Sequence, residues 1–246
     1  MALKAAPDDQ ALLLDLQALD TKLDQLDHKA KSLPQHAVLT SIAAELATAR
    51  HSALESTGAR EDVAAELTRL ESDVEVVEAR IARDTQRLEA SSSVKDVAAL
   101  EQELAALRKR RDDLEEIELT VMERLEEVES AAAVRSAAVD TLVEKQSAVE
   151  AERDAALGEL ANERTHAAAN RRTIEAKVPA DLLALYEKQR SRYGFGASLL
   201  RFGVSSANGV KLLENDLQAI RALAPDDVYI CPSSDAILVR TSESGL

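Results

Sequence analysis

Apolar residues recur at alternating spacings of three and four over most of the first 178 residues, which is the pattern of a coiled-coil seam. The first run ends at Leu33, and Pro34 separates it from a second run. A third run extends from Val97 to Leu160, and fourteen of its nineteen seam positions are apolar. The three runs predict helices over about residues 8–33, 35–90 and 94–178.

A short polar stretch, Ser91–Ser93, separates the second predicted helix from the third and offers N-cap side chains to the latter. Short loops join antiparallel neighbours. At ~1.5 Å per residue, the third helix is about as long as the first two laid end to end. The pattern therefore predicts a mainly α fold, a long antiparallel coiled-coil hairpin with its tip at 91–93 and both chain ends near its base.

Five positions of the third seam are polar instead of apolar. One interpretation is that they specify the register at some cost in stability, with the long side chains extending to solvent. The other is that they loosen the hairpin for a partner helix, and the sequence does not decide between the two. These positions are Arg111, Glu118, Arg135, Gln146 and Arg153.

The composition changes at Val178-Pro179, where proline disfavours a continuing helix. All five aromatic residues and five of the seven glycines lie beyond this point. We therefore predict a coiled-coil helical hairpin over 1–178 and a small α+β domain over 179–246.

The formal net charge is −15, and nearly all of the excess precedes residue 180. An acidic surface repels phosphate backbones and anionic lipid, so we expect a protein partner and no membrane partner. The chain has no signal-peptide pattern near its start and no apolar window of membrane-spanning length. With Cys231 as its single cysteine, it is expected to be cytoplasmic.

The motifs of phosphate-binding loops and of nucleophilic hydrolases are absent from the sequence, so neither an enzymatic activity nor a cofactor is expected. The densest basic run is Arg108, Lys109, Arg110 and Arg111. It could contact phosphate, or it could pair with the acidic residues that follow it.

Aromatic residues of the C-terminal region form a second candidate surface. Stacking rings beside arginines would suit single-stranded nucleic acid, whereas the same rings could instead fill a core. The candidate rings are Tyr193, Phe195 and Tyr229, and the neighbouring arginines are Arg192, Arg201 and Arg240.

Two stretches carry a resemblance to a known family. They are SSVKDVAALEQELAALRKRRDDLEEIELTVMERLEEVE at the start of the third predicted helix, and DLLALYEKQR with NDLQAIRALAPDDVYICPSSDAILVR near the end. The chain resembles coiled-coil hairpin proteins that end in a C4-type zinc ribbon. The resemblance implies four cysteine ligands, but the corresponding positions are Ser205, Asn208, Cys231 and Ser234.

One cysteine, one amide and two hydroxyls do not supply the ligands that structural zinc requires. We therefore expect a ribbon-like fold without metal, held together by apolar side chains. The expected core residues are Leu199, Leu200, Phe202, Val210, Leu212, Leu217, Ile220, Val228, Ile230, Ile237 and Val239.

The resemblance and the acidic charge together imply a protein-interaction adaptor or chaperone-like factor with a coiled-coil arm and a metal-free head. The alternative is a nucleic-acid-binding regulator of RNA or DNA that acts through the ribbon and the basic run. A homodimer that associates through the seam also stays open.

Overall fold

The computed structural model describes residues 3–246, and their contacts divide the chain into two compact units. Unit 1 comprises Met1–Pro34 with Glu152–Leu246, and unit 2 comprises Gln35–Ala151. The predicted division after residue 178 concerns which segments fold by themselves, and it stays a prediction. The helices are α1 (Pro7–Lys31), α2 (Pro34–Ala90), α3 (Val94–Glu175), α4 (Ala180–Tyr193) and α5 (Glu214–Ala222), and the strands are β1 (Ala197–Arg201), β2 (Val204–Ser205) and β3 (Ile237–Val239).

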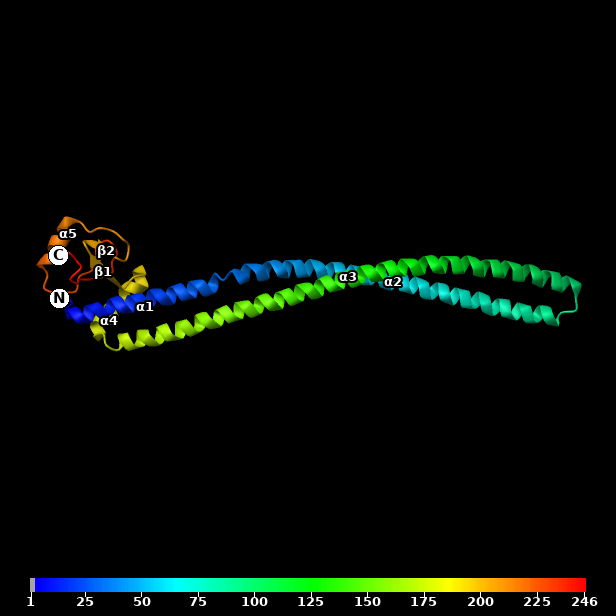
Figure 1. The fold of residues 1–246 in the computed structure, drawn as a ribbon, viewed down its shortest axis with the longest axis horizontal. Coiled ribbons are helices and arrows are strands. Elements are labelled where there is room, and N and C mark those ends of the chain that lie inside the picture. Colours follow the sequence, from blue (N-terminus) through cyan, green and yellow to red (C-terminus); the bar gives the residue numbers. More distant parts are fainter. Residues whose placement is uncertain (1–2) are drawn as a thin grey trace. The chain divides into compact units, whose positions relative to one another are not determined.

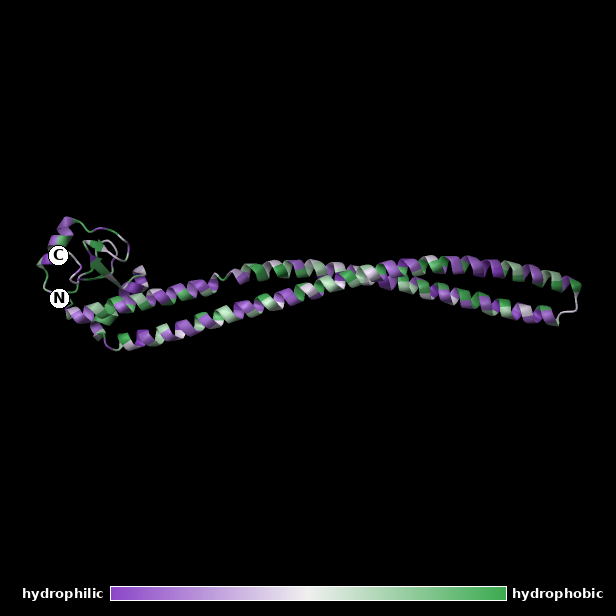
Figure 2. Cartoon of the chain, in the orientation of Figure 1, coloured by the Kyte–Doolittle hydropathy of each residue, from purple (hydrophilic) through white to green (hydrophobic). Residues whose placement is uncertain are grey.

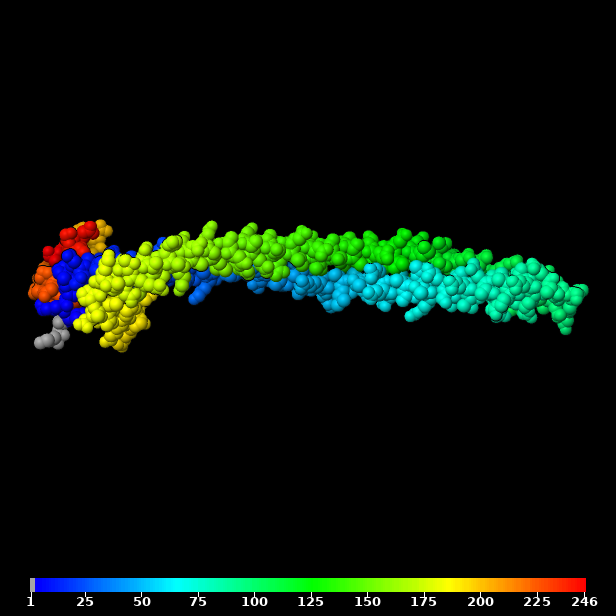
Figure 3. Space-filling view, turned by 90° about the horizontal axis from the view of Figure 1, so that it is seen from below, coloured from blue at the N-terminus to red at the C-terminus, as the bar shows by residue number. Residues whose placement is uncertain are grey.

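Unit 2 is a coiled-coil hairpin in which α2 and α3 lie side by side up to a tip at residues 91–93 (Figures 1 and 3). Apolar and polar residues alternate along both helices (Figure 2). The predicted seam is the buried stripe, and the predicted fold class is confirmed. Its buried apolar members are Ile42, Leu46, Val63, Leu104, Leu114 and Val121.

Polar contacts also cross the seam of unit 2. The Arg135 guanidinium donates to the hydroxyl of buried Ser56, and both residues occupy seam positions. Near the tip, the buried Asp84 carboxylate is paired within α2 itself, 3.2 Å from Nη1 of Arg87 and 3.7 Å from Nε of Arg80. Because a cross-helix contact of this kind fixes which turns face each other, Arg135 fits the interpretation of register specification.

Two prolines set helix boundaries. Pro34 is the first residue of α2, where its missing N–H costs nothing. The last residue of α3 is Glu175, three residues before the predicted end, because Pro179 disfavours helical geometry at Val178. Residues 176–178, between the end of α3 and Pro179, form turns, and the Val178 N–H donates to the Glu175 carbonyl over 3.2 Å.

The C-terminal segment of unit 1 contains a three-stranded sheet of order β2-β1-β3. Strand β1 pairs antiparallel with β2 and parallel with β3, with Ser198 opposite Leu238. Helix α1 and helix α4 pack against this sheet. Together they enclose a first core cluster that includes Leu13, Leu16, Leu182, Tyr186 and Ile237.

A second core cluster lies between the sheet and α5. It contains Leu200, Leu212, Leu217, Ile220, Cys231 and Leu238. Three residues predicted for this core, Phe202, Val210 and Ile230, are instead exposed, which corrects the prediction. Phe202 occupies the turn between β1 and β2, where no element covers it.

Candidate partner-binding surfaces

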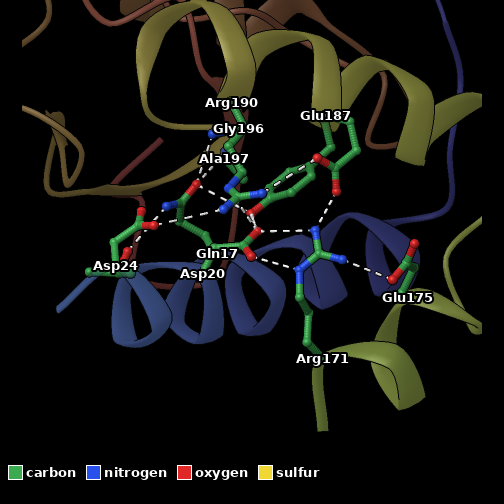
Figure 4. Close-up of polar contacts among 11 residues, drawn as sticks. Gln17, Asp20, Asp24, Arg171, Glu175, Glu187, Arg190, Gly196 and Ala197 are labelled. Atoms are coloured by element: carbon green, nitrogen blue, oxygen red, sulfur yellow. Dashed lines mark hydrogen bonds and ion pairs between the residues drawn. The ribbon is translucent and has the colours of Figure 1, made fainter. Parts of the chain in front are cut away.

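A buried carboxylate joins three helices of unit 1 (Figure 4). Asp20 of α1 is fully buried, and its oxygens accept from Nε of Arg171 (2.6 Å) and from the Tyr186 hydroxyl (2.7 Å). Nε of Arg190 lies 3.2 Å from the same carboxylate. Arg171 belongs to α3, whereas Tyr186 and Arg190 belong to α4. A buried charge needs such partners, so this one residue ties α1, α3 and α4 together.

Acidic residues complete the network around Arg171. Its Nη1 donates to Glu175 over 2.8 Å, and its Nη2 pairs with Glu187 of α4. The hydrogen bond with Asp20 is the main cause of a raised pKa at Arg171, so the guanidinium stays charged. Burial, followed by the hydrogen bond to Asp20, raises the pKa of Tyr186, which keeps the phenol protonated as a donor.

The joint between α4 and β1 is held by the same region of α1. The Gln17 side-chain oxygen accepts from the backbone N–H groups of Gly196 (2.8 Å) and Ala197 (3.3 Å). A Cβ at Gly196 would lie 2.4 Å from the Tyr186 ring, so only glycine fits there. The joint is therefore fixed by contacts between residues about 180 positions apart.

A groove of about 390 Å³ lies where this joint meets α1. Phe195 is partly exposed at its edge, and Tyr193, which precedes the joint, is also exposed. The Arg192 guanidinium lies over the Tyr193 ring, 5.3 Å from its centre. The groove is lined by Thr21, Asp24, Gln25, His28, Lys29, Gly194 and Phe195.

A second exposed surface surrounds the β1–β2 turn. Phe202 is 71% exposed, and its backbone N–H donates to the Glu243 carbonyl over 3.1 Å. Leu212 donates to the carbonyl of Gly203 over 2.8 Å, which brings Leu213, 73% exposed, beside the turn. We call Phe202, Leu213 and Leu246 the turn patch.

Leu246 joins this patch through the residue before it. The ideal Cβ position of Gly245 lies 3.5 Å from the Cα of Phe202, so the end of the chain packs on the turn. Arg201 lies with its guanidinium 5.8 Å from the centre of the Phe202 ring and pairs with Glu243 over 3.1 Å. Backbone contacts of Leu212 and Gly245 thus bring two other segments of the chain to the turn that carries Phe202, with Arg201 beside its ring.

The other predicted aromatic and basic residues of this region lie elsewhere. Tyr229 is half-buried against the second core cluster. Arg240 donates to backbone carbonyls after α5, including that of Ala224 over 2.7 Å, so it is a structural residue. The structure therefore does not gather the predicted aromatic residues and arginines into one stacking platform.

The four positions at which the resemblance to zinc-ribbon proteins implies metal ligands lie on two loops of unit 1. The Asn208 side-chain amide donates to the Ser233 carbonyl over 3.0 Å, which links the two loops. The Ser205 hydroxyl lies 2.7 Å from that of Ser198, and the buried Cys231 sulfur lies 3.2 Å from the Ser233 hydroxyl.

These residues do not fit a zinc ion. They provide a single thiol, and the amide at Asn208 and the hydroxyl at Ser205 are used in hydrogen bonds to other groups. Over residues 3–246, no group of three or more His, Cys, Asp or Glu side chains could hold a metal ion. Hydrogen bonds between the loops occupy the place where the resemblance implies a metal.

The basic run lies on α3 in unit 2, and its four residues differ in whether they form ion pairs. Arg111 pairs with Asp112 (2.7 Å) and with Glu115 (3.2 Å). Arg108, Lys109 and Arg110 are exposed and form no ion pair with any residue that the structure describes. Local pairing therefore explains one residue of the four.

The sequence reading missed the residues that matter most in unit 1. Gln17 and Asp20 flank the first seam, and no local pattern distinguishes them from solvated polar residues. Phe202 did carry a signal, since Phe-Gly stands between two short apolar segments where a two-residue hairpin loop usually has Asn-Gly. In the part of the chain that is described, no helix is long and apolar enough to cross a membrane.

Comparisons with known proteins agree with this architecture. The chain is 33% identical over 239 residues to an uncharacterized protein of Mycobacterium tuberculosis, covering 97% of this chain and 98% of the relative. A solved structure from Mycobacterium smegmatis superposes with a TM-score of 0.86 at 33% identity, over 97% of this chain and all of that one.

A more distant likeness shows the fold alone. The structure of CT398 from Chlamydia trachomatis superposes with a TM-score of 0.63 at 19% identity, over 95% of this chain and 98% of that one. The model of the CT398-like coiled coil hairpin domain matches residues 16–194. By this match and by its relatives, the chain belongs to the family of CT398-like coiled coil hairpin proteins.

Proposed function

We propose that this protein is a non-enzymatic, cytoplasmic interaction adaptor. It combines a coiled-coil arm with a small head, residues 179–246, and the head binds a protein partner through the turn patch. The observation that carries the proposal is Phe202, a large exposed aromatic residue in a backbone conformation that costs stability. The remaining contacts of the head support it.

The β1–β2 loop has two residues, since Arg201 pairs directly with Val204. Both loop residues have positive φ, 47° at Phe202 and 75° at Gly203. This is the pattern of a type I′ turn, which strongly favours Asn-Gly. A residue with a Cβ loses ~1 kcal/mol in this conformation, and bulky residues rarely adopt it. Stability alone would therefore not select Phe at position 202.

Strained, exposed aromatic residues fit a binding role. Local strain concentrates at functional sites, and aromatic side chains with arginine dominate the energy of protein interfaces. The turn patch offers Phe202 as an anchor, flanked by Leu213 and Leu246, with Arg201 beside the ring. We propose that the partner has an apolar pocket that receives Phe202.

The head is proposed to be a metal-free version of a zinc ribbon. The hydrogen bond from Asn208 to Ser233 links the two loops that a shared metal would link, and the second core cluster supplies apolar packing beneath them. This accounts for a folded head without four thiolates.

The test uses immobilised full-length protein and a nuclease-treated lysate of the cells in which the protein occurs. Phe202→Asn should keep the fold, because asparagine suits the turn, and should lose the polypeptide that the wild type retains. The matched control is Leu54→Asn, which removes a side chain 70% exposed on α2 and should retain the same polypeptide. Equal retention by both variants would overturn the proposal.

A second candidate, binding of RNA or DNA, is favoured by the three unpaired basic residues at 108–110. Phosphate contacts release counterions, so such binding would weaken steeply with salt and with Arg110→Ala. If a labelled RNA or DNA strand does not bind even at low ionic strength, this candidate is eliminated.

A further inference from the structure

Charge is divided unevenly along the hairpin of unit 2. Residues 79–111, which we call the basic tip, contain eight Lys and Arg against five Asp and Glu, a net charge of +3. Residues 54–78 of α2 and 112–129 of α3, which we call the acidic segment, contain three against seventeen, a net charge of −14. Since the whole chain carries −15, nearly all of its excess lies in this segment.

The two zones correspond on the two helices. Cross-helix pairs join Arg80 to Glu103 within the basic tip and Glu66 to Arg124 within the acidic segment. The change of sign therefore occurs at one level of the hairpin, on both helices, and is a property of the surface and not of one helix alone.

Much of the charge in the basic tip is free. Arg80 and Arg87 pair with Asp84, and Arg111 pairs with acidic neighbours. The other five basic side chains are exposed and form no ion pair with any residue in the described range 3–246. They are Arg83, Lys95, Arg108, Lys109 and Arg110.

The acidic segment combines unbalanced charge with exposed apolar side chains. Its ion pairs neutralise only a few of seventeen carboxylates, so the segment repels itself. Leu119 and Met122, three residues apart on α3, share one face and are exposed, and Val76 is exposed on α2. Leu119 and Met122 thus give the acidic segment a small apolar surface that a partner could cover.

We propose that the basic tip docks onto the acidic segment of a second copy of this chain, with the two hairpins antiparallel. A two-fold axis near the boundary between the zones brings each basic tip against the other copy's acidic segment, so one contact occurs twice. The α2 part of the tip spans about 18 Å and that of the acidic segment about 37 Å, so the tip fits within the segment. The contact covers Leu119 and Met122.

The charge pattern favours a second copy over a polyanion. A nucleic acid or an extended acidic peptide longer than about 18 Å would continue from the basic tip onto a surface of net charge −14 and be repelled. A partner whose own charge changes sign at the same spacing meets no such repulsion. This chain is such a partner.

The test is sedimentation equilibrium of the full-length protein over a wide concentration range, at ~0.02 M and ~0.5 M salt. We expect a monomer–dimer equilibrium that weakens at the higher salt. Reversal of the tip (Arg108→Glu, Lys109→Glu, Arg110→Glu) should weaken self-association at least about tenfold. Reversal of three exposed acids (Asp113→Lys, Glu116→Lys, Glu123→Lys) should do the same. Circular dichroism checks that both variants keep their helices.

Mixing the two reversed variants gives the sharpest result. In the mixture, the reversed tip of one variant meets the segment that carries three lysines in the other, and the unchanged tip of the second variant meets the unchanged acidic segment of the first. The heterodimer should therefore form more readily than either variant associates with itself. A wild type that stays monomeric at every concentration overturns the proposal. A dimer that persists in both reversed variants also overturns the proposal, because another surface must then form the dimer interface. Binding of poly-glutamate or RNA by a monomeric wild type would assign the tip to that ligand instead.

Discussion

The hairpin of unit 2 and unit 1 are stabilised in different ways. Within unit 1, we call residues 179–246 the head, and the parts of α1 and α3 that contact it the base. Unit 2 repeats one interaction, an apolar seam between two helices, and polar residues such as Ser56, Asp84 and Arg135 occupy some positions of that seam. Unit 1 combines two apolar core clusters with a few buried polar groups, above all Asp20, whose partners lie more than 150 residues away in sequence.

The two units therefore respond differently to the loss of a single contact. A repeated seam distributes its stability over many small contributions, so loss of one contact is local. A buried charge concentrates stability in one place, because removing it leaves cationic partners without compensation.

The largest expected effect is that of Asp20→Ala. The substitution leaves the partly buried guanidiniums of Arg171 and Arg190 without their shared partner, and should lower the free energy of unfolding of unit 1 by about 3–5 kcal/mol. Chemical denaturation followed by circular dichroism measures it.

Asp24→Ala is the matched control one turn further along α1. Its carboxylate is mostly exposed and lies 4.0 Å from Arg190, so the change should cost less than about 0.5 kcal/mol. Equal effects of the two variants would show that burial of Asp20 does not matter.

In the seam, Val121→Ala should cost about 2 kcal/mol in unfolding free energy, since Val121 is buried between the helices. Val134→Ala, on the same helix but 68% exposed, should cost close to zero. The comparison is made by thermal unfolding of the full-length variants. A large loss from Val134→Ala would mean that α3 is covered on a face outside the seam.

Tyr186→Phe should cost about 1 kcal/mol near neutral pH, because the hydroxyl donates to buried Asp20. The folded state raises the pKa of Tyr186, so above the unfolded value of about 10 only the unfolded chain loses this proton. Stability from this group is therefore complete below pH 10 and declines above it. The difference between wild type and variant should shrink from pH 10 upward, and a constant difference would contradict the assignment.

The smallest effect has the opposite sign. Phe202→Asn should raise the unfolding free energy by about 0.5–1 kcal/mol, because asparagine adopts the positive φ of the turn more readily. Phe202→Ala keeps the unfavourable conformation and should give no such gain. Thermal unfolding of the two variants side by side measures the difference, and equal melting temperatures would remove the argument from strain.

The sequence was a good guide to unit 2 and a poor one to unit 1, for physical reasons. The positions of Leu104, Leu114 and Val121 follow from their spacing, because seam burial depends on local periodicity. The tip at 91–93 follows from three serines between two periodic runs. Helix α3 ended earlier than predicted because the effect of Pro179 reaches back to Val178.

The base was not predictable because its contacts are non-local. Nothing near Gln17 or Asp20 in sequence shows that β1, α3 and α4 will come to them. In the C-terminal region, eleven apolar residues are predicted to form the core, but three of them, Phe202, Val210 and Ile230, lie in turns and on outer faces. Short strands give little periodicity from which the inner face can be identified.

The most direct test of this contrast is hydrogen exchange, measured by mass spectrometry, of the wild type and Asp20→Ala. The account predicts that the variant loses protection in α1, α4 and the three strands, whereas peptides of unit 2 around Val63 and Leu114 keep theirs. Unchanged protection in unit 1, or equal loss throughout both units, would contradict the claim that one buried carboxylate holds the base together independently of the seam.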